Sequence, residues 1–120
     1  MNPYLTAVQQ FQRKFSRHFH DAPSLDVPQH IKEMRMRIMQ EEVAEVVEAI
    51  QQDDLPAIAK ELADVLYTVL GTVDTYGLST KFDEIFAEVH RSNMTKEVNL
   101  EGKAVKGSRY QPAKIEKLVR

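Results

Sequence analysis

Five carboxylates near the middle of the chain have the spacing of a divalent-metal site. Glu41, Glu42 and Glu45 form one group, and Glu61 and Asp64 follow after fifteen intervening residues. Carboxylate oxygens are hard ligands, and a site that leaves room for water and phosphate oxygens suits Mg²⁺ or Mn²⁺. Burying such acids without cations or basic partners is very unfavourable, because they lose hydration and repel one another. We therefore interpret the five acids as a metal site.

Two helices, joined by only a residue or two, must position these acids. Apolar residues recur at helical spacing over about residues 28–52 and again over about residues 54–77. On a wheel of about 100° per residue, Glu42 and Glu45 fall within the stripe of the first helix that otherwise holds Ile, Met and Ala. Glu61 and Asp64 share one edge of the apolar sector of the second. Two pairs on neighbouring helices can thus face a common point, whereas Glu41 lies on the flank.

Two further helices complete an all-α chain. Asn2 and Pro3 open a first helix, whose apolar stripe extends over residues 5–19. Ser79 is expected to cap a fourth helix that ends near Asn93. The remainder contains glycine, proline and scattered bases, so we expect an irregular tail with a possible short last helix. Short connections favour antiparallel neighbours in a bundle.

At these acids the sequence resembles the MazG-like nucleotide pyrophosphohydrolases. This all-α superfamily also contains phosphoribosyl-ATP pyrophosphohydrolase and the dimeric dUTPases. The shared signature is E-E-x-x-E followed, after a helical hairpin, by E-x-x-D, which here is Glu41-Glu42-x-x-Glu45 and Glu61-x-x-Asp64. The resemblance covers roughly residues 31–112, and it implies a four-helix MazG-like bundle.

The tail of the chain extends the resemblance. Members of the family commonly have an Asn followed three residues later by a base, here Asn93 and Lys96, and the basic segment GKAVKGSRYQP is similar to that of one subgroup. Arg91 and Lys96 would hold the outgoing pyrophosphate, Asn93 would contact base or sugar, and one of three bases would close over the phosphates. These three are Lys103, Lys106 and Arg109.

The resemblance also implies the reaction. Glu42, Glu45, Glu61 and Asp64 would be ligands of Mg²⁺ or Mn²⁺, and Glu41 would hold a second cation or act on the attacking water. A nucleoside triphosphate would be hydrolysed between its α- and β-phosphates to a monophosphate and pyrophosphate, in the housecleaning of nucleotide pools. Metal ions serve such a reaction by neutralising phosphate oxygens and acidifying a bound water.

A partner subunit is expected on two grounds. Active sites in this superfamily are generally completed by one. Independently, the helix over residues 28–52 carries a second broad apolar face, which suggests an interface as well as a core. Its members are Met36, Met39, Val43, Val46, Val47 and Ile50. We expect a homodimer, or a tetramer made from dimers.

Composition sets the remaining bounds. The 120 residues carry a net charge of -2 and no cysteine, so thiolate metal sites and disulfides are excluded. Residues 31–64 are net acidic and residues 91–120 net basic. No signal peptide or membrane span is expected, and we expect a cytoplasmic protein without nucleic-acid polymer or membrane partners. We predict one domain over residues 1–120, with a catalytic core at about 28–96 and a basic tail at 97–120.

The pattern of acids and histidines also bears on three alternative classes of protein. A di-iron bundle needs Glu-x-x-His pairs, and no histidine has an acid three residues before it, so this class is excluded. Phosphoribosyl-ATP pyrophosphohydrolase remains an alternative within the enzyme class. A non-catalytic helical dimerisation or binding module, with the acids as a solvated face, remains the alternative outside it.

Overall fold

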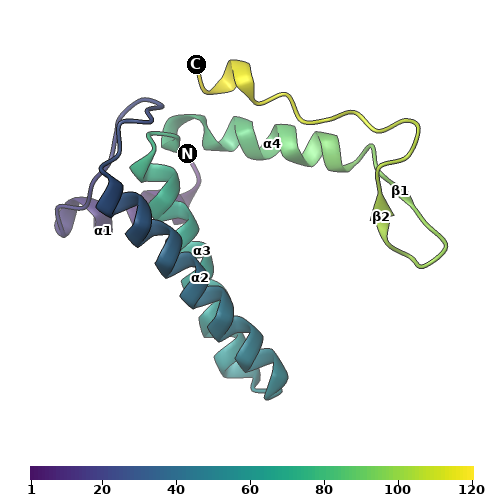
Figure 1. Ribbon diagram of the computed structural model, residues 1–120, viewed down its shortest axis with the longest axis horizontal. Coiled ribbons are helices and arrows are strands. Elements are labelled where there is room, and N and C mark those ends of the chain that lie inside the picture. The colour runs from purple at the N-terminus through teal and green to yellow at the C-terminus, as the bar shows by residue number, and fades with distance from the viewer. The chain divides into compact units, whose positions relative to one another are not determined.

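Helices make up nearly all of the regular structure in the computed structural model, which describes residues 1–120 (Figure 1). The chain divides into two units, Met1–Thr80 and Lys81–Arg120. The first unit contains α1 (Pro3–Lys14), α2 (Gln29–Gln51) and α3 (Leu55–Thr75), and a single 3-10 turn η1 (Ser79–Lys81) follows. The second contains α4 (Phe82–Asn93), strands β1 (Glu97–Val98) and β2 (Ala104–Val105), and the 3-10 turn η2 (Glu116–Leu118). The prediction of an all-α fold is confirmed.

The helical hairpin of α2 and α3 dominates the first unit, as predicted. Its connection is three residues long, and Asp53 adopts a left-handed conformation there (φ 53°). Asp54 then caps α3, because its side chain accepts a hydrogen bond from the backbone N–H of Ala57 at 3.2 Å. Beyond the end of α3, Gly77 has φ 70°, the conformation that favours glycine after a helix.

Helix α1 packs against α3 and is shorter than its apolar pattern predicts. Asn2 accepts a hydrogen bond from the N–H of Tyr4 at 2.8 Å, which makes it the predicted N-cap. The helix ends at Lys14, since Ser16 takes a left-handed φ of 50° and turns the chain away. The assignment of Phe19 to the helical stripe is therefore wrong. Its ring instead lies 3.8 Å from the Arg13 guanidinium carbon.

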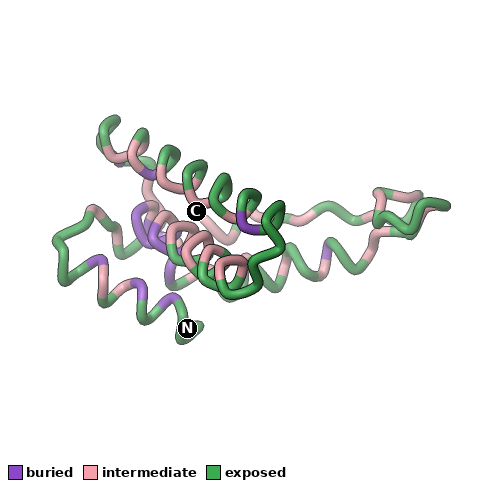
Figure 2. The backbone as a smooth tube through the Cα atoms, turned by 90° about the horizontal axis from the view of Figure 1, so that it is seen from below, coloured by how far each residue is buried: buried purple, intermediate pink, exposed green.

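A buried carboxylate fastens α1 to the end of α3. Asp74 is fully buried and accepts hydrogen bonds from Arg13 at 2.5 Å, from Gln9 at 3.1 Å and from Ser79 at 2.8 Å. Ser79 therefore bonds Asp74 and does not cap α4, which begins at Phe82 without a side-chain cap. Most of the buried residues of the first unit gather at this meeting of α1 with the C-terminal half of α3 (Figure 2). This junction is the core that holds α3 in place.

The outer faces of α2 and α3 keep large apolar side chains exposed. They are Met36, Val43, Val47 and Ile50 on α2, with Leu55, Leu62 and Leu66 on α3. Four of them belong to the second apolar face predicted from the sequence. No helix combines the length and the apolar character needed to cross a membrane.

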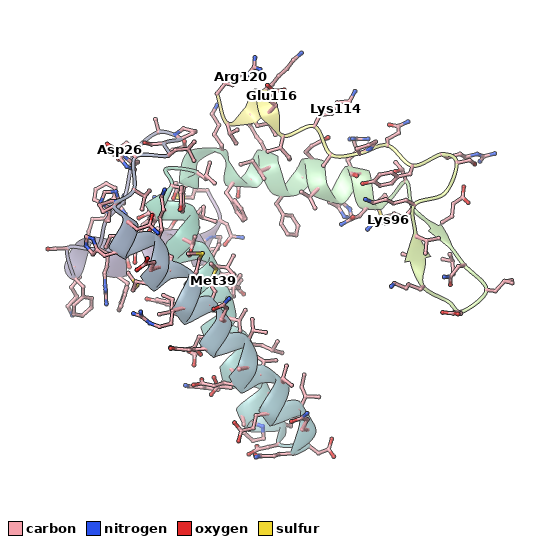
Figure 3. The ribbon with its side chains drawn as sticks, viewed as in Figure 1. Asp26, Met39, Lys96, Lys114, Glu116 and Arg120 are labelled. Atoms are coloured by element: carbon pink, nitrogen blue, oxygen red, sulfur yellow. The ribbon has the colours of Figure 1, made fainter.

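In the second unit, the tail is tied to α4 by a charged network. Glu88 accepts hydrogen bonds from Arg91 at 2.6 and 2.8 Å and from the backbone N–H of Lys114 at 2.7 Å. Figure 3 shows Lys114 on the stretch of tail that runs beside α4. Arg91 also donates to Gln111 at 3.0 Å and to the carbonyl oxygen of Pro112 at 3.2 Å. Strands β1 and β2 pair antiparallel before this stretch.

Candidate metal centre and adjoining pocket

Three of the five predicted acids converge between α2 and α3. One carboxylate oxygen each from Glu42, Glu45 and Glu61 lies within 4.8 Å of the others. Glu42 and Glu45 are three residues apart on α2, so they project from the same side of that helix, and Glu61 meets them from α3. The helical hairpin thus creates an acidic cluster of the kind that the sequence predicts.

The cluster is short of positive charge and of hydrogen-bond donors. The oxygens Glu42 Oε2 and Glu61 Oε2 are buried and accept no hydrogen bond. The pKa of Glu61 is raised, first because the facing carboxylate of Glu45 can share a proton with it, and then because burial removes water; Lys60 opposes the shift. Buried acceptor oxygens without donors are what a divalent cation would satisfy, so these residues fit a hard metal ion.

Asp64 lies beside the cluster but is engaged by a lysine of its own helix. Lys60 Nζ is 2.6 Å from Asp64 Oδ2 and 3.5 Å from Glu61 Oε1. The hydrogen bond to Asp64 raises the pKa of Lys60. The lysine side chain is 68% exposed, so it can swing away at little cost. Lys60 therefore acts as a replaceable counter-ion of the predicted ligands.

Glu41 lies outside the group of three converging acids. Its side chain is 61% exposed, and its nearest basic partner is Arg37 Nε at 3.9 Å. This position agrees with the flank predicted from the helical wheel. It is compatible with a role on water or on a second cation, and it separates Glu41 from the three clustered ligands.

The four predicted substrate-binding residues belong to the second unit. Asn93 is exposed at the end of α4, and Lys96 follows it, half-buried (Figure 3). Lys106 Nζ lies 5.3 Å from the centre of the Tyr110 ring. Arg91 already makes the bonds to Glu88 and to the tail described above, so a phosphate would have to replace some of them.

A cavity of about 310 Å³ adjoins the acidic cluster in the first unit. Helices α1, α2 and α3 line it, and Glu42 belongs to both the cavity and the acidic cluster. Its apolar walls come from Phe11, Met34, Ile38 and Tyr67. Small-molecule sites in proteins are mostly apolar hollows of this size or larger, with a few polar groups that fix the ligand.

Besides the carboxylate of Glu42, two buried polar side chains of the cavity carry hydrogen-bond donors. Gln12 is 2% exposed, and its amide Nε2 has no hydrogen-bond partner. Arg35 is 5% exposed and donates to Thr72 at 3.0 Å and to the carbonyl oxygen of Thr68 at 2.7 Å, but it has no carboxylate partner. Burial lowers the pKa of Arg35, and the nearby Arg17 lowers it further.

Gly71 makes room for this arginine. A Cβ atom at position 71 would collide with the Arg35 guanidinium. Arg35 and Gln12 are not among the residues predicted to be functional from the sequence, although the helical wheel contains the indication. Arg35 lies at about 40° from Ile31, inside the apolar stripe of α2, and Gln12 lies at about 40° from Val8 on α1. A polar residue on an apolar line, the pattern that identified Glu42, would have identified both.

A comparison with protein families identifies the class. Residues 8–93, most of the chain, match the family model described as phosphoribosyl-ATP pyrophosphohydrolase. The match and the fold define an all-α nucleotide pyrophosphohydrolase, a hydrolase class that depends on divalent metal. The chain belongs to the phosphoribosyl-ATP pyrophosphohydrolase family, which confirms the resemblance inferred from its acids. A comparison with curated proteins gave no match.

Proposed function

We propose that the protein hydrolyses a nucleoside triphosphate between its α- and β-phosphates, with Mg²⁺, to a monophosphate and pyrophosphate. The observation that carries this proposal is the position of Glu42. This residue has a buried, unpartnered oxygen in the acidic cluster and also lines the neighbouring cavity. A ligand in the cavity therefore lies next to the metal centre. A role in nucleotide-pool housecleaning, in the cytoplasm, belongs to the same proposal.

The carboxylates divide the work of the reaction. Glu42, Glu45 and Glu61 would hold the cation, and Asp64 would join them once Lys60 moves aside. When bound, a divalent ion supplies charge neutralisation for the phosphates and a more acidic water. Glu41, exposed and only loosely paired with Arg37, would accept the proton of the attacking water.

The cavity would receive the base and the sugar. Its aromatic and aliphatic walls suit a flat ring, and its buried polar groups would bond the carbonyl oxygens and amino groups at the edge of the base. Gln12 Nε2 and the Arg35 guanidinium would donate to carbonyl oxygens at the edge of the base, whereas the Glu42 carboxylate, if not taken up by the metal, would accept from an amino group. A base that leaves Gln12 Nε2 unpaired would bind more weakly, since a buried donor without a partner costs about 1–3 kcal/mol.

The family resemblance supports roles for Lys96 on the phosphates and for Asn93 on the sugar or base, and the positive charge of Arg91 and Lys106 suits them to the phosphates as well. Arg91 could offer a phosphate the N–H that now bonds Gln111 while it keeps its charge-assisted pair with Glu88. The exposed apolar side chains of α2 and α3 support a homodimer, or a tetramer made from dimers. Val43→Asp with Val47→Asp should then lower the mass measured by light scattering to that of the monomer.

Phosphoribosyl-ATP is the second candidate substrate, because the matching family carries that name. One experiment separates the candidates. Pyrophosphate release is measured over a panel of canonical and altered (d)NTPs and phosphoribosyl-ATP, with Mg²⁺ or Mn²⁺. Glu42→Gln should abolish release, whereas Glu48→Gln, an exposed glutamate on the same helix, should not. The enzyme proposal fails if no nucleotide on the panel is cleaved by the wild type.

A further inference from the structure

Charged side chains of opposite sign line different parts of the cavity beside the acidic cluster. Glu42 and Arg35 both line it, and they are seven residues apart on the same side of α2. Seven residues are two helical turns, so the two positions are about 10 Å apart along the helix. Arg17 also lines the cavity, whereas Glu42 is the only acid among the lining residues. A metal ion bound at Glu42 would therefore leave the cavity positively charged.

The buried guanidinium of Arg35 has spare hydrogen-bond donors and no anionic partner. Its Nε donates to Thr72 and its Nη2 to the carbonyl oxygen of Thr68, which uses two of the five N–H groups of an arginine. Asp74 has a favourable electrostatic effect on Arg35, but this carboxylate is paired with Arg13. A buried charge is unfavourable unless it is paired, so a bound anion would stabilise this end of the cavity.

Gln12 and Arg17 would share in binding such an anion. Gln12 is 2% exposed, and its Nε2 has no acceptor. The backbone N–H of Arg17 donates to the carbonyl oxygen of Gln12 at 2.8 Å, which keeps the two residues together. The charge of Arg17 acts on Arg35, because after burial it is the next cause of the lowered pKa of that residue. Two guanidinium groups and an unpaired amide N–H thus belong to one cavity.

We propose that the substrate has a negatively charged base, which rests on the proposed function because that function places the base in this cavity. With the phosphates at the metal ion near Glu42, the far edge of the base would meet Arg35 and Gln12. A carboxylate on the ring supplies such a charge, and so does a ring that loses a proton near neutral pH, as xanthine does. Guanidinium groups bind anionic oxygens strongly. The cavity would then select altered bases over the standard ones, which are neutral at this pH.

Binding of nucleoside monophosphates to the full-length protein, in excess Mg²⁺, tests the charge of the base without any hydrolysis. One matched pair is 5-carboxyuridine monophosphate and its 5-carboxamide, which have nearly the same shape and differ in charge. Xanthosine and inosine monophosphates form a second pair, in which the ring itself is the acid. In calorimetry the charged member of at least one pair should bind about tenfold more tightly or better, because hydrogen bonds to charged groups are the stronger ones. The pair that shows the preference identifies the source of the charge.

Three variants locate the group that recognises the charge. Arg35→Gln should reduce the preference for the charged probe to about twofold or less, because an amide keeps donors and loses the charge. Arg17→Gln should reduce it by a smaller factor, and this exposed position gives a result even where loss of Arg35 prevents folding. Lys14→Gln removes an exposed cation of α1 that does not line the cavity, and it should leave the preference unchanged.

Equal affinities within both pairs, or no measurable binding of either charged probe to the wild type, would overturn the proposal. A preference that persists in both Arg35→Gln and Arg17→Gln would do the same. Failure of the proposed function gives a different result, because no triphosphate then releases pyrophosphate although the charged monophosphate still binds more tightly. Pyrophosphate release without any preference for a charged base would leave the function standing and remove this inference alone.

Discussion

Glu61 on α3 and Glu88 on α4 are both mostly covered glutamates, yet their surroundings are opposite. Glu88 has a guanidinium and a backbone N–H directed at its oxygens, and these lower its pKa to about 2. Glu61 faces another carboxylate, has one oxygen without a donor, and its pKa is raised. Donors of the chain itself bond the oxygens of Glu88. One oxygen of Glu61 lacks such a donor, and a bound cation would supply the missing partner. We propose that this difference separates a structural carboxylate, Glu88, from a metal-binding one, Glu61.

Removing the functional acid should give the largest effect on activity. Glu61→Gln is expected to lower kcat/KM for pyrophosphate release by about a hundredfold or more, because a ligand of the metal is lost. The metal-free variant should be at least as stable as the wild type, since a poorly satisfied buried charge is removed. Thermal unfolding in the presence of a chelator measures this. A clear loss of metal-free stability would make Glu61 a structural residue after all.

Removing a carboxylate that is fully hydrogen-bonded within the chain should lower stability rather than activity alone. Asp74 is the most enclosed acid of this kind, with three side-chain donors. Asp74→Ala is expected to lower the free energy of unfolding by about 2–4 kcal/mol, because Gln9, Arg13 and Ser79 lose a common acceptor. Urea unfolding followed by circular dichroism gives the value. An unchanged midpoint would show that this junction does not hold α1 on α3.

The two glutamates should also differ in their response to pH. A raised carboxyl pKa means that the folded state binds the proton more tightly than the unfolded state does. The contribution of Glu61 to stability is therefore present below the unfolded pKa of about 4.5 and is lost as pH rises through its folded pKa. In metal-free protein this decline should vanish in Glu61→Gln. Excess Mg²⁺ should offset it in the wild type, since the cation favours the ionised form.

The contribution of Glu88 to stability should depend on pH in the opposite direction, and this effect should be the smallest of the four. Its contribution is present above the unfolded pKa of 4.5 and is lost as pH falls towards about 2. Glu88→Gln should therefore lower stability near neutrality and change it least at the acid end, which flattens the acid limb of the stability profile. Urea midpoints measured over that pH range give the comparison. A flattening on the alkaline side instead would contradict the assignment.

Sequence reasoning reached the acids of α2 and α3 because helix geometry is local. The angle between Glu42 and Ile38 follows from counting residues, and burial of the shared stripe follows from it. The same count places Arg35 and Gln12 in the core, where only their unusual polarity indicated a role. The end of α1 and the path of the tail depend instead on a single backbone conformation and on a contact between residues far apart in the sequence. Neither the left-handed turn at Ser16 nor the bond from Lys114 to Glu88 leaves a periodic pattern.

Lys60, beside Asp64, should allow the acidic hairpin to fold without a bound metal. Lys60 contacts both Asp64 and Glu61, and it lowers the repulsion among the acids while α2 and α3 come together. A chelator should therefore stop pyrophosphate release and leave the circular dichroism spectrum unchanged. Lys60 thus supplies a positive charge at the position that the cation would take. Until a cation takes its position, Lys60 would lower the repulsion among the acids of the folded hairpin.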